Sequence, residues 1–189
     1  WTLRDAAITA WERGSGMTVG AAILICDLRN FTHISDLWPR DDVIELLNGY
    51  FDAMCDPIEE FGGEILKFMG DGLLAIFPLS DPKACENLLK AIASAQTGLV
   101  ALNEINRQKG HDPLGYGIGV HVGDFIYGNI GSKPRHDFTV IGPAVNIASR
   151  LETLTKETGR TVLFSEEFVR MAGNRGELEN LGPWLLRGL

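Results

Sequence analysis

Cysteine is scarce in this sequence, and the spacing of the cysteines is not typical of a disulfide framework or of a zinc site. The chain has three cysteines, Cys26, Cys55 and Cys85, and no CxxC motif. An odd number of widely spaced cysteines argues against a disulfide framework and against a structural zinc site. We therefore expect reduced thiols, as in a cytoplasmic protein.

Long hydrophobic runs and an excess of positive charge are also absent. No apolar run approaches the ~18 residues that cross a membrane, and residues 1–16 lack the apolar core of a signal peptide. The formal net charge of −8 disfavours contact with nucleic acid or with an anionic membrane. We expect no nucleic-acid partner, no direct membrane contact from this segment, and a cytoplasmic location. An anionic ligand would need a local site or bound metal cations.

The remaining composition is typical of one folded domain. The chain has 189 residues, of which 45% are hydrophobic and 22% are charged. These values exclude disorder, collagen and a coiled coil as descriptions of the whole chain. The sequence starts with Trp1 instead of methionine. We therefore expect an excerpt of a longer protein, with residues 1–18 as a lead-in from an upstream region and residues 19–189 as the folded domain.

Hydrophobic periodicity and turn residues divide the chain into short strands and three long helices. Asp41 and Asp42 suit a helix N-terminus, Gly62 and Gly63 stop that helix, and Pro57 should kink its last turn. The expected helices are 41–61, 82–108 and 144–157. The expected strands are 20–26, 64–69, 73–77, 115–122, 124–130, 136–141, 161–164 and 184–188.

The order of these elements predicts the fold class. It begins with the split βαβ pattern of ferredoxin-like folds. Two of the strands are joined by Gly70-Asp71-Gly72, which indicates a β-hairpin. We therefore expect an α/β (α+β) domain with a ferredoxin-like βαββαβ core. Further strands should extend this core to a mostly antiparallel sheet flanked by helices.

Two aspartates lie where a sheet and a hairpin can bring them together. Asp27 ends the first expected strand, and Asp71 occupies the expected hairpin tip. Two carboxylates form a hard-oxygen site suited to Mg²⁺, with room left for phosphate oxygens. Taken singly, each residue has a simpler explanation, because Asp71 fits an ordinary Asp-Gly turn and Asp27 fits a helix cap.

Backbone groups near these aspartates could approach a phosphate. The segment after Asp27 leads into a short helix, and its N–H groups could hold phosphates without side-chain charge. The glycines of the hairpin would let a phosphate approach the backbone. The residues of this expected phosphate-binding segment are Arg29, Asn30, Phe31, Thr32 and Gly70.

Four further residues are candidates for nucleotide contacts. Asn146 and Arg150 are four positions apart in PAVNIASRLE, so a helix places them on one face, where they could bind a ribose and a phosphate. Lys67 and Thr139 lie in expected strands. Taken singly, Arg150 fits a solvated helix face, Lys67 a lysine pointing to solvent, and Thr139 an ordinary β-branched strand residue.

Together and in order, these residues resemble the catalytic domain of the class III nucleotidyl cyclases, the adenylate and guanylate cyclases. The matching stretches cover residues 20–157 almost continuously, and LLRGL near the end matches more weakly. Four motifs at family-like spacing make the resemblance specific. The stretches are ILICDLRNFT, GGEILKFMGDGLLAIF, GIGVHVGDFIYGNIG and FTVIGPAVNIASRLE.

The resemblance implies a role for each candidate residue. Asp27 and Asp71 match the aspartates that hold two Mg²⁺ or Mn²⁺ ions, and Leu28 lies where a backbone carbonyl assists. Asn30 departs from the pattern, because the family often has glycine there. The other matches are Lys67 and Thr139 to the purine-reading positions, Asn146 to the ribose-orienting asparagine, Arg150 to the transition-state arginine and Arg187 to a basic residue on the triphosphate.

The resemblance also implies a reaction and an assembly. The expected activity is an adenylate cyclase that converts ATP to 3′,5′-cyclic AMP and pyrophosphate. The expected assembly is a head-to-tail homodimer with two shared sites, each formed by both chains. Residues 19–189 would be the catalytic domain, located in the cytoplasm as part of a larger protein that a membrane anchor could hold.

The chemistry of the purine-reading pair favours ATP. Lys67 can only donate a hydrogen bond, which suits adenine N1, and Thr139 can accept one from N6. Guanine reverses both groups, and guanylate cyclases of this family carry glutamate and cysteine there. The alternatives are a guanylate cyclase and a catalytically weak, nucleotide-binding regulatory domain. A diguanylate cyclase would need a GGDEF signature, which this sequence lacks.

Overall fold

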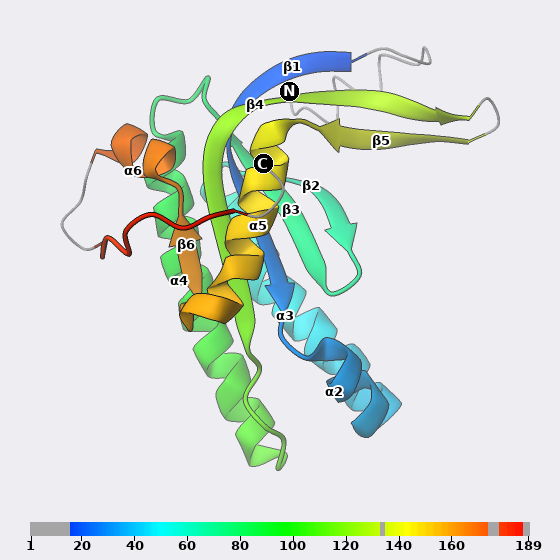
Figure 1. Ribbon diagram of the computed structural model, residues 1–189. Coiled ribbons are helices and arrows are strands. Elements are labelled where there is room, and N and C mark those ends of the chain that lie inside the picture. The colour runs from blue at the N-terminus through cyan, green and yellow to red at the C-terminus, as the bar shows by residue number, and fades with distance from the viewer. Residues whose placement is uncertain (1–15, 133–134, 174–177, 187–189) are drawn as a thin grey trace.

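One sheet with helices on both faces forms the structure. The computed structural model describes residues 16–132, 135–173 and 178–186 (Figure 1). The strands are β1 (Gly16–Leu28), β2 (Glu64–Met69), β3 (Gly72–Pro78), β4 (Tyr116–Ser132), β5 (Arg135–Ile141) and β6 (Val162–Phe164). The helices are α2 (Phe31–Leu37), α3 (Arg40–Glu60), α4 (Ala84–Gln108), α5 (Pro143–Thr158) and α6 (Glu166–Ala172).

The sheet has the strand order of a ferredoxin-like core. Its order is β2-β3-β1-β4-β5, and β6 pairs with β4 at one side of this path. The pairs along the path are antiparallel, whereas β6 runs parallel to β4. The expected fold class, a ferredoxin-like core extended to a mostly antiparallel sheet, is confirmed.

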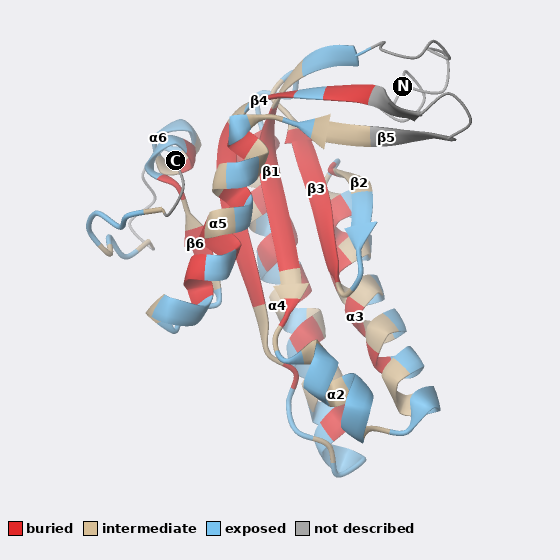
Figure 2. Ribbon diagram, turned by 45° about the vertical axis from the view of Figure 1, so that its right-hand side comes forward, coloured by how far each residue is buried: buried red, intermediate tan, exposed pale blue. Residues whose placement is uncertain are grey.

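The two faces of the sheet have separate cores, and β1 contributes to both. Ala22, Leu24 and Cys26 face the core shared with α3 and α4. Ile23 and Ile25 alternate with them and face the core shared with α5. Figure 2 shows this central strand buried between the helical layers. Because side chains alternate along a strand, Asp27 is on the α5 face of the sheet.

Glycines in β4 let α5 lie directly on the sheet. A Cβ at Gly119 would clash with the Ala148 carbonyl oxygen and the Glu152 nitrogen, which are backbone atoms that cannot rotate away. A Cβ at Gly123 would lie 2.8 Å from the Ala144 methyl group. The alternating glycines of GYGIGVHVG therefore set how closely α5 approaches β4, and so where the side chains of α5 lie.

Two sequence-based expectations about the strands were wrong. The expected strands 115–122 and 124–130 are one strand, β4, because β1 pairs with it from Leu28 back to Gly16. The expected strand 184–188 is not formed in the part that the structure describes, residues 184–186. Here the chain packs by side chains instead, with Leu181 and Leu186 against the small core of Leu151, Leu154 and Leu163.

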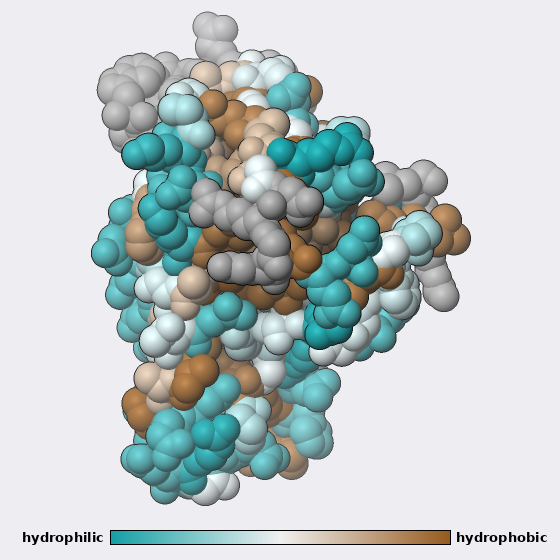
Figure 3. All heavy atoms as spheres, turned by 90° about the vertical axis from the view of Figure 1, so that its left-hand side faces the viewer, coloured by the Kyte–Doolittle hydropathy of each residue, from teal (hydrophilic) through white to brown (hydrophobic). Residues whose placement is uncertain are grey.

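Helix α6 was not expected from the sequence. Ser165 caps it, because its hydroxyl accepts a hydrogen bond from the Phe168 N–H, and the Phe168 side chain is fully buried. On the face that carries α6 and β6, hydrophobic residues lie among hydrophilic ones (Figure 3). Within the described ranges, no helix combines the length and the apolar character that crossing a bilayer requires.

Candidate active site

The hairpin between β2 and β3 brings Asp71 beside the end of β1. Gly70 adopts a left-handed conformation with φ 65°, which closes the turn tightly. A Cβ at Gly72 would lie 2.7 Å from the Cys26 carbonyl oxygen and 3.1 Å from Asp27 Oδ1. Because Gly72 has no side chain, the turn reaches Asp27, and the two aspartate carboxyl groups come within hydrogen-bonding reach, so that they share a hydrogen bond when one of them is protonated.

This pairing changes the acidity of Asp27. Burial, the hydrogen bond with Asp71 and the Asp71 charge together raise the Asp27 pKa to about 6. The Glu152 charge raises it further, whereas Lys156 lowers it. Two carboxylates that repel each other at neutral pH are stabilised by a cation, so this donor pair fits a hard divalent ion.

In metal-free protein, we expect the Asp27 carboxyl to titrate near pH 6, as its raised pKa requires. The folded state holds this proton more tightly than the unfolded chain, whose pKa is 3.8. This carboxyl therefore lowers the free energy of unfolding as pH rises from 3.8 to about 6. Carboxyl ¹³C NMR titration measures this pKa directly.

Asp71→Asn should move the Asp27 titration toward lower pH, because it removes the neighbouring charge. Asp36→Asn, on the exposed surface of α2, is the matched control and should leave the titration unchanged. An Asp27 titration that is identical in wild type and Asp71→Asn would contradict the pairing.

The segment after Asp27 has one backbone N–H group that the fold itself uses. The Leu28 N–H donates to Asp27 Oδ1 at 3.1 Å, and the Arg29 N–H donates to the Gly115 carbonyl at 2.8 Å. The Arg29 N–H is therefore already used by the fold. The other expected members keep their positions: Asn30 directly precedes α2, Gly70 lies in the hairpin turn, and Phe31 and Thr32 are in the first turn of α2, where N–H groups have no partner within a helix.

Asn30 adopts the conformation that explains its departure from the family pattern. It precedes α2 with φ 57° and ψ 27°, in the left-handed region. Glycine adopts this region freely, and asparagine tolerates it better than most other residues. Asn30 therefore preserves the backbone turn that a glycine would make.

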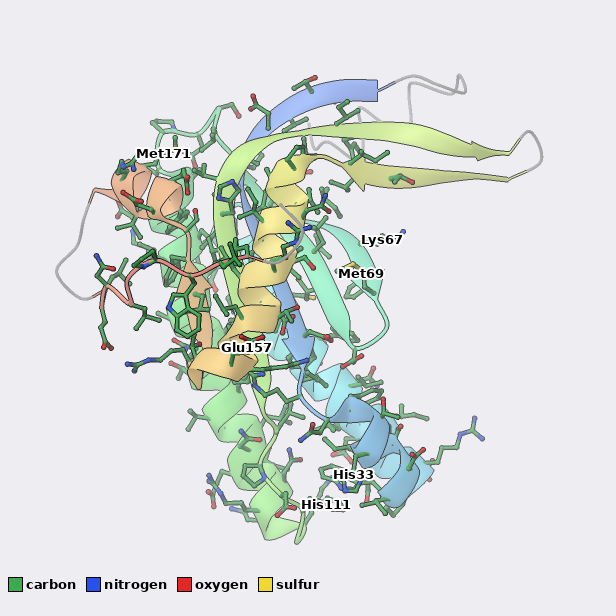
Figure 4. The ribbon with its side chains drawn as sticks, viewed as in Figure 1. His33, Lys67, Met69, His111, Glu157 and Met171 are labelled. Atoms are coloured by element: carbon green, nitrogen blue, oxygen red, sulfur yellow. The ribbon has the colours of Figure 1, made fainter. Side chains whose placement is uncertain are left out.

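The two purine-reading candidates lie on the two strands at the ends of the sheet path. Lys67 is exposed on β2 and pairs with Leu74, whose side chain belongs to the α5-side core. Figure 4 shows Lys67 and Met69 along the outer edge of β2. Thr139 is half-buried on β5, opposite Gly128. The β4–β5 hairpin projects from the body on the same side as β2 (Figure 1).

Asn146 and Arg150 lie on α5, as the spacing predicted. The helix buries Ala148, Glu152 and Thr155 toward the sheet, while Asn146 is exposed and Arg150 is half-buried. The charges with the largest effects on Asp27 are Asp71, Glu152 and Lys156. The structure thus brings the two aspartates together, and it places the four other candidates on β2, β5 and α5. Arg187 lies outside the described residues.

Sequence reasoning missed Glu152. Glu152 is 5% exposed, and among the residues that the structure describes its Oε1 has no hydrogen-bond partner. Burial raises its pKa, whereas Lys156 and Arg29 lower it. A glutamate in an amphipathic helix normally faces solvent, so the only signal was the row of glycines in the facing strand.

Two of the four histidines make contacts within the fold that account for their positions. His111 stacks on Trp38 with ring centroids 3.8 Å apart, and its Nε2 lies 3.0 Å from Asp42 Oδ2. His121 is buried, and its Nδ1 lies 2.7 Å from the Ser165 hydroxyl. Neither lies at the aspartate pair.

The family profile of the adenylate and guanylate cyclase catalytic domain matches residues 17–188. The chain therefore belongs to this family, the class III nucleotidyl cyclases. An adenylate cyclase of Anabaena cylindrica is 38% identical over 163 residues, which are 84% of this chain and 32% of that protein. Adenylate cyclase 1 of Rhizobium meliloti is 29% identical over 87% of this chain and 25% of its own length. The chain spans about a third of these relatives or less.

Solved structures show the same architecture. The crystal structure of the guanylyl cyclase Cya2 matches with a TM-score of 0.72 and 32% identity, over 87% of this chain and 82% of that one. The adenylyl cyclase CyaB from P. aeruginosa matches with a TM-score of 0.73 and 27% identity, over 83% of this chain and 82% of that one. The relatives thus include both purine specificities.

Proposed function

We propose that this domain is an adenylate cyclase that converts ATP to 3′,5′-cyclic AMP and pyrophosphate. The observation that carries the proposal is the Asp27–Asp71 pair, which the hairpin places at the end of β1 on the face covered by α5. Lys67 and Thr139, in place of glutamate and cysteine, support adenine as the base.

Asp27 and Asp71, assisted by the Leu28 carbonyl, would hold two Mg²⁺ or Mn²⁺ ions. Such ions lower the pKa of the ribose 3′-hydroxyl and neutralise the triphosphate. Phe31 and Thr32 would direct backbone N–H groups at the phosphates. Bound metal ions and backbone N–H groups can hold the triphosphate without positively charged side chains. An acidic chain can therefore bind an anionic substrate.

The other residues would recognise the nucleoside and stabilise the reacting phosphate. Lys67 would donate to adenine N1, and Thr139 would accept from N6. Asn146 would orient the ribose, so that its 3′-oxygen lies in line with the α-phosphate. Arg150 would stabilise the charge that develops on the α-phosphate and on the leaving oxygen.

The active unit we propose is a homodimer with two shared sites. Lys67 and Asp71 are four positions apart near one end of a single hairpin, at most about 13 Å from each other, yet one would contact the base and the other the metal ions. A second copy lets both residues contact one nucleotide. Asp27 and Asp71 would come from one chain, and the residues that bind the base and the ribose and stabilise the transition state would come from its partner. A two-fold arrangement then forms two equivalent sites.

Exposed apolar side chains support this arrangement. Phe68 and Met69, next to Lys67 on β2, are 53% and 43% exposed. Ile126 and Ile141, a cross-strand pair beside the Gly128–Thr139 pair, are each 47% exposed. Burying these side chains against a second copy would favour association and would cover both purine-reading positions.

Product analysis tests the proposed activity. Purified protein is incubated with ATP or with GTP in the presence of Mn²⁺, and cyclic products are separated by chromatography. We expect cyclic AMP from ATP, faster than cyclic GMP from GTP, and no product after chelation of the metal. Faster formation of cyclic GMP would instead establish the guanylate cyclase alternative, which the likeness to Cya2 favours. No cyclic product from either nucleotide would overturn both.

A further inference from the structure

A side-chain contact ties the end of β1 to the C-terminal half of α5. Arg29, two residues after Asp27, donates from Nη2 to the Thr155 hydroxyl at 2.7 Å and to the Arg160 carbonyl at 3.3 Å. Thr155 is fully buried, and its hydroxyl donates in turn to the Glu152 carbonyl. The Arg29 backbone is also fixed, because its N–H donates to Gly115.

The surroundings make this contact a built feature of the fold. A Cβ at Gly117 would lie 2.5 Å from Thr155 Oγ1, 2.7 Å from Glu152 Oε1 and 3.4 Å from Arg29 Nη2. The contact therefore needs a glycine at this point of β4. The Arg29 charge also lowers the pKa of the buried Glu152 carboxyl, so the carboxylate and the guanidinium stabilise each other.

The two ends of the contact belong to different halves of the proposed machinery. Arg29 adjoins Asp27, in the metal-binding half, whereas Thr155 lies on the helix that carries Asn146 and Arg150. In the proposed homodimer, these two halves of one chain serve two different active sites. We infer that Arg29 and Thr155 are positioning residues. Their contact fixes the metal-binding residues of a chain relative to the α5 residues of the same chain, and it so couples the two active sites. This inference rests on the proposed function.

The first test compares Thr155→Val with Thr155→Ser. Valine keeps the shape but removes the hydroxyl, whereas serine keeps the hydroxyl and is the matched control. A displacement of about 1 Å at reacting groups can cost ~10²-fold, so we expect kcat of Thr155→Val to fall by at least about tenfold. KM should rise by a smaller factor than kcat falls, because the base contacts of Lys67 and Thr139 are not on α5 or at the end of β1. Thr155→Ser should retain the wild-type kcat.

If Thr155→Val does not fold, as judged by thermal unfolding, Arg29→Gln replaces it. Arg29 is only half-buried, and glutamine is too short to maintain both contacts. The same kcat loss is expected, again with a smaller change in KM. A wild-type kcat in a folded variant of either residue would overturn the positioning role, as would an equal loss in Thr155→Ser.

The second test separates the two halves in mixed dimers. In a mixture of Asp71→Asn and Arg150→Ala chains, the one intact site takes its carboxylates from the Arg150→Ala chain and its α5 residues from the Asp71→Asn chain. Thr155→Val is then added to one chain or to the other. If the contact couples the two sites, the activity of the mixture should fall at least about tenfold in both combinations. A loss in only one combination, or in neither, would overturn it.

The parent mixture without Thr155→Val distinguishes failure of the shared-site proposal from failure of the positioning role. If that mixture is inactive while the chains exchange, the shared-site proposal fails. The comparison of Thr155→Val with Thr155→Ser still tests the positioning role in that case.

Discussion

Asp71→Asn is expected to lower kcat for cyclic AMP formation by about 10³-fold. Asparagine preserves the shape of the turn but removes one of the two charges that would hold the ions. Metal-ion catalysis contributes several kcal/mol, and a loss of about 4 kcal/mol corresponds to roughly a thousandfold. The measurement is the initial rate at saturating ATP, with Mg²⁺ and with Mn²⁺.

The control for this variant lies in the same chain. Asp36→Asn removes an equal charge from the exposed surface of α2 and should retain wild-type activity. Titration with Mn²⁺, followed by electron paramagnetic resonance, should show weaker ion binding by Asp71→Asn only. Near wild-type turnover by a folded Asp71→Asn protein would contradict the two-metal assignment.

The double variant Lys67→Glu with Thr139→Cys is expected to shift the preference toward GTP. Glutamate would accept from the guanine N–H groups, and it cannot donate to adenine N1. A pocket that pairs polar groups rejects the wrong partner strongly, so the ATP-to-GTP ratio of kcat/KM should fall by at least ~10²-fold. Competing initial rates with the two nucleotides measure this ratio.

The single variants show which residue carries the discrimination. Lys67→Glu alone should account for most of the shift, because lysine can only donate, whereas the Thr139 hydroxyl can donate and accept. Lys90→Glu, which makes the same charge change on the exposed surface of α4, is the matched control and should keep the ratio. A ratio that stays constant in the double variant would show that these residues do not read the purine.

Local patterns predicted most of the helices. The expected helix 41–61 corresponds to α3, which contains Pro57. Its hydrophobic periodicity, its acidic first turn and the two glycines after its end indicated this helix. The Gly-Asp-Gly tip predicted both the β2–β3 turn and the meeting of Asp71 with Asp27. These features depend on residues close in sequence, where capping and turn chemistry act directly.

Features that depend on distant residues were not predicted. We expected separate strands 115–122 and 124–130, yet pairing with β1 keeps β4 continuous between them. The Arg29 side chain was not expected to reach Thr155, because that contact spans 126 positions. Glu152 is buried only because Gly117 and Gly119 admit α5 so closely, which no pattern within the helix itself indicates.

Mixing two inactive chains tests the central claim, that each active site is formed by two copies. Asp71→Asn damages one half-site and Arg150→Ala the other, so a mixed dimer collects both lesions in one site and none in the other. With random pairing about half of the dimers are mixed, and activity should return to roughly a quarter of wild type. A mixture as inactive as its components, with subunit exchange demonstrated by differently tagged chains, would contradict the account.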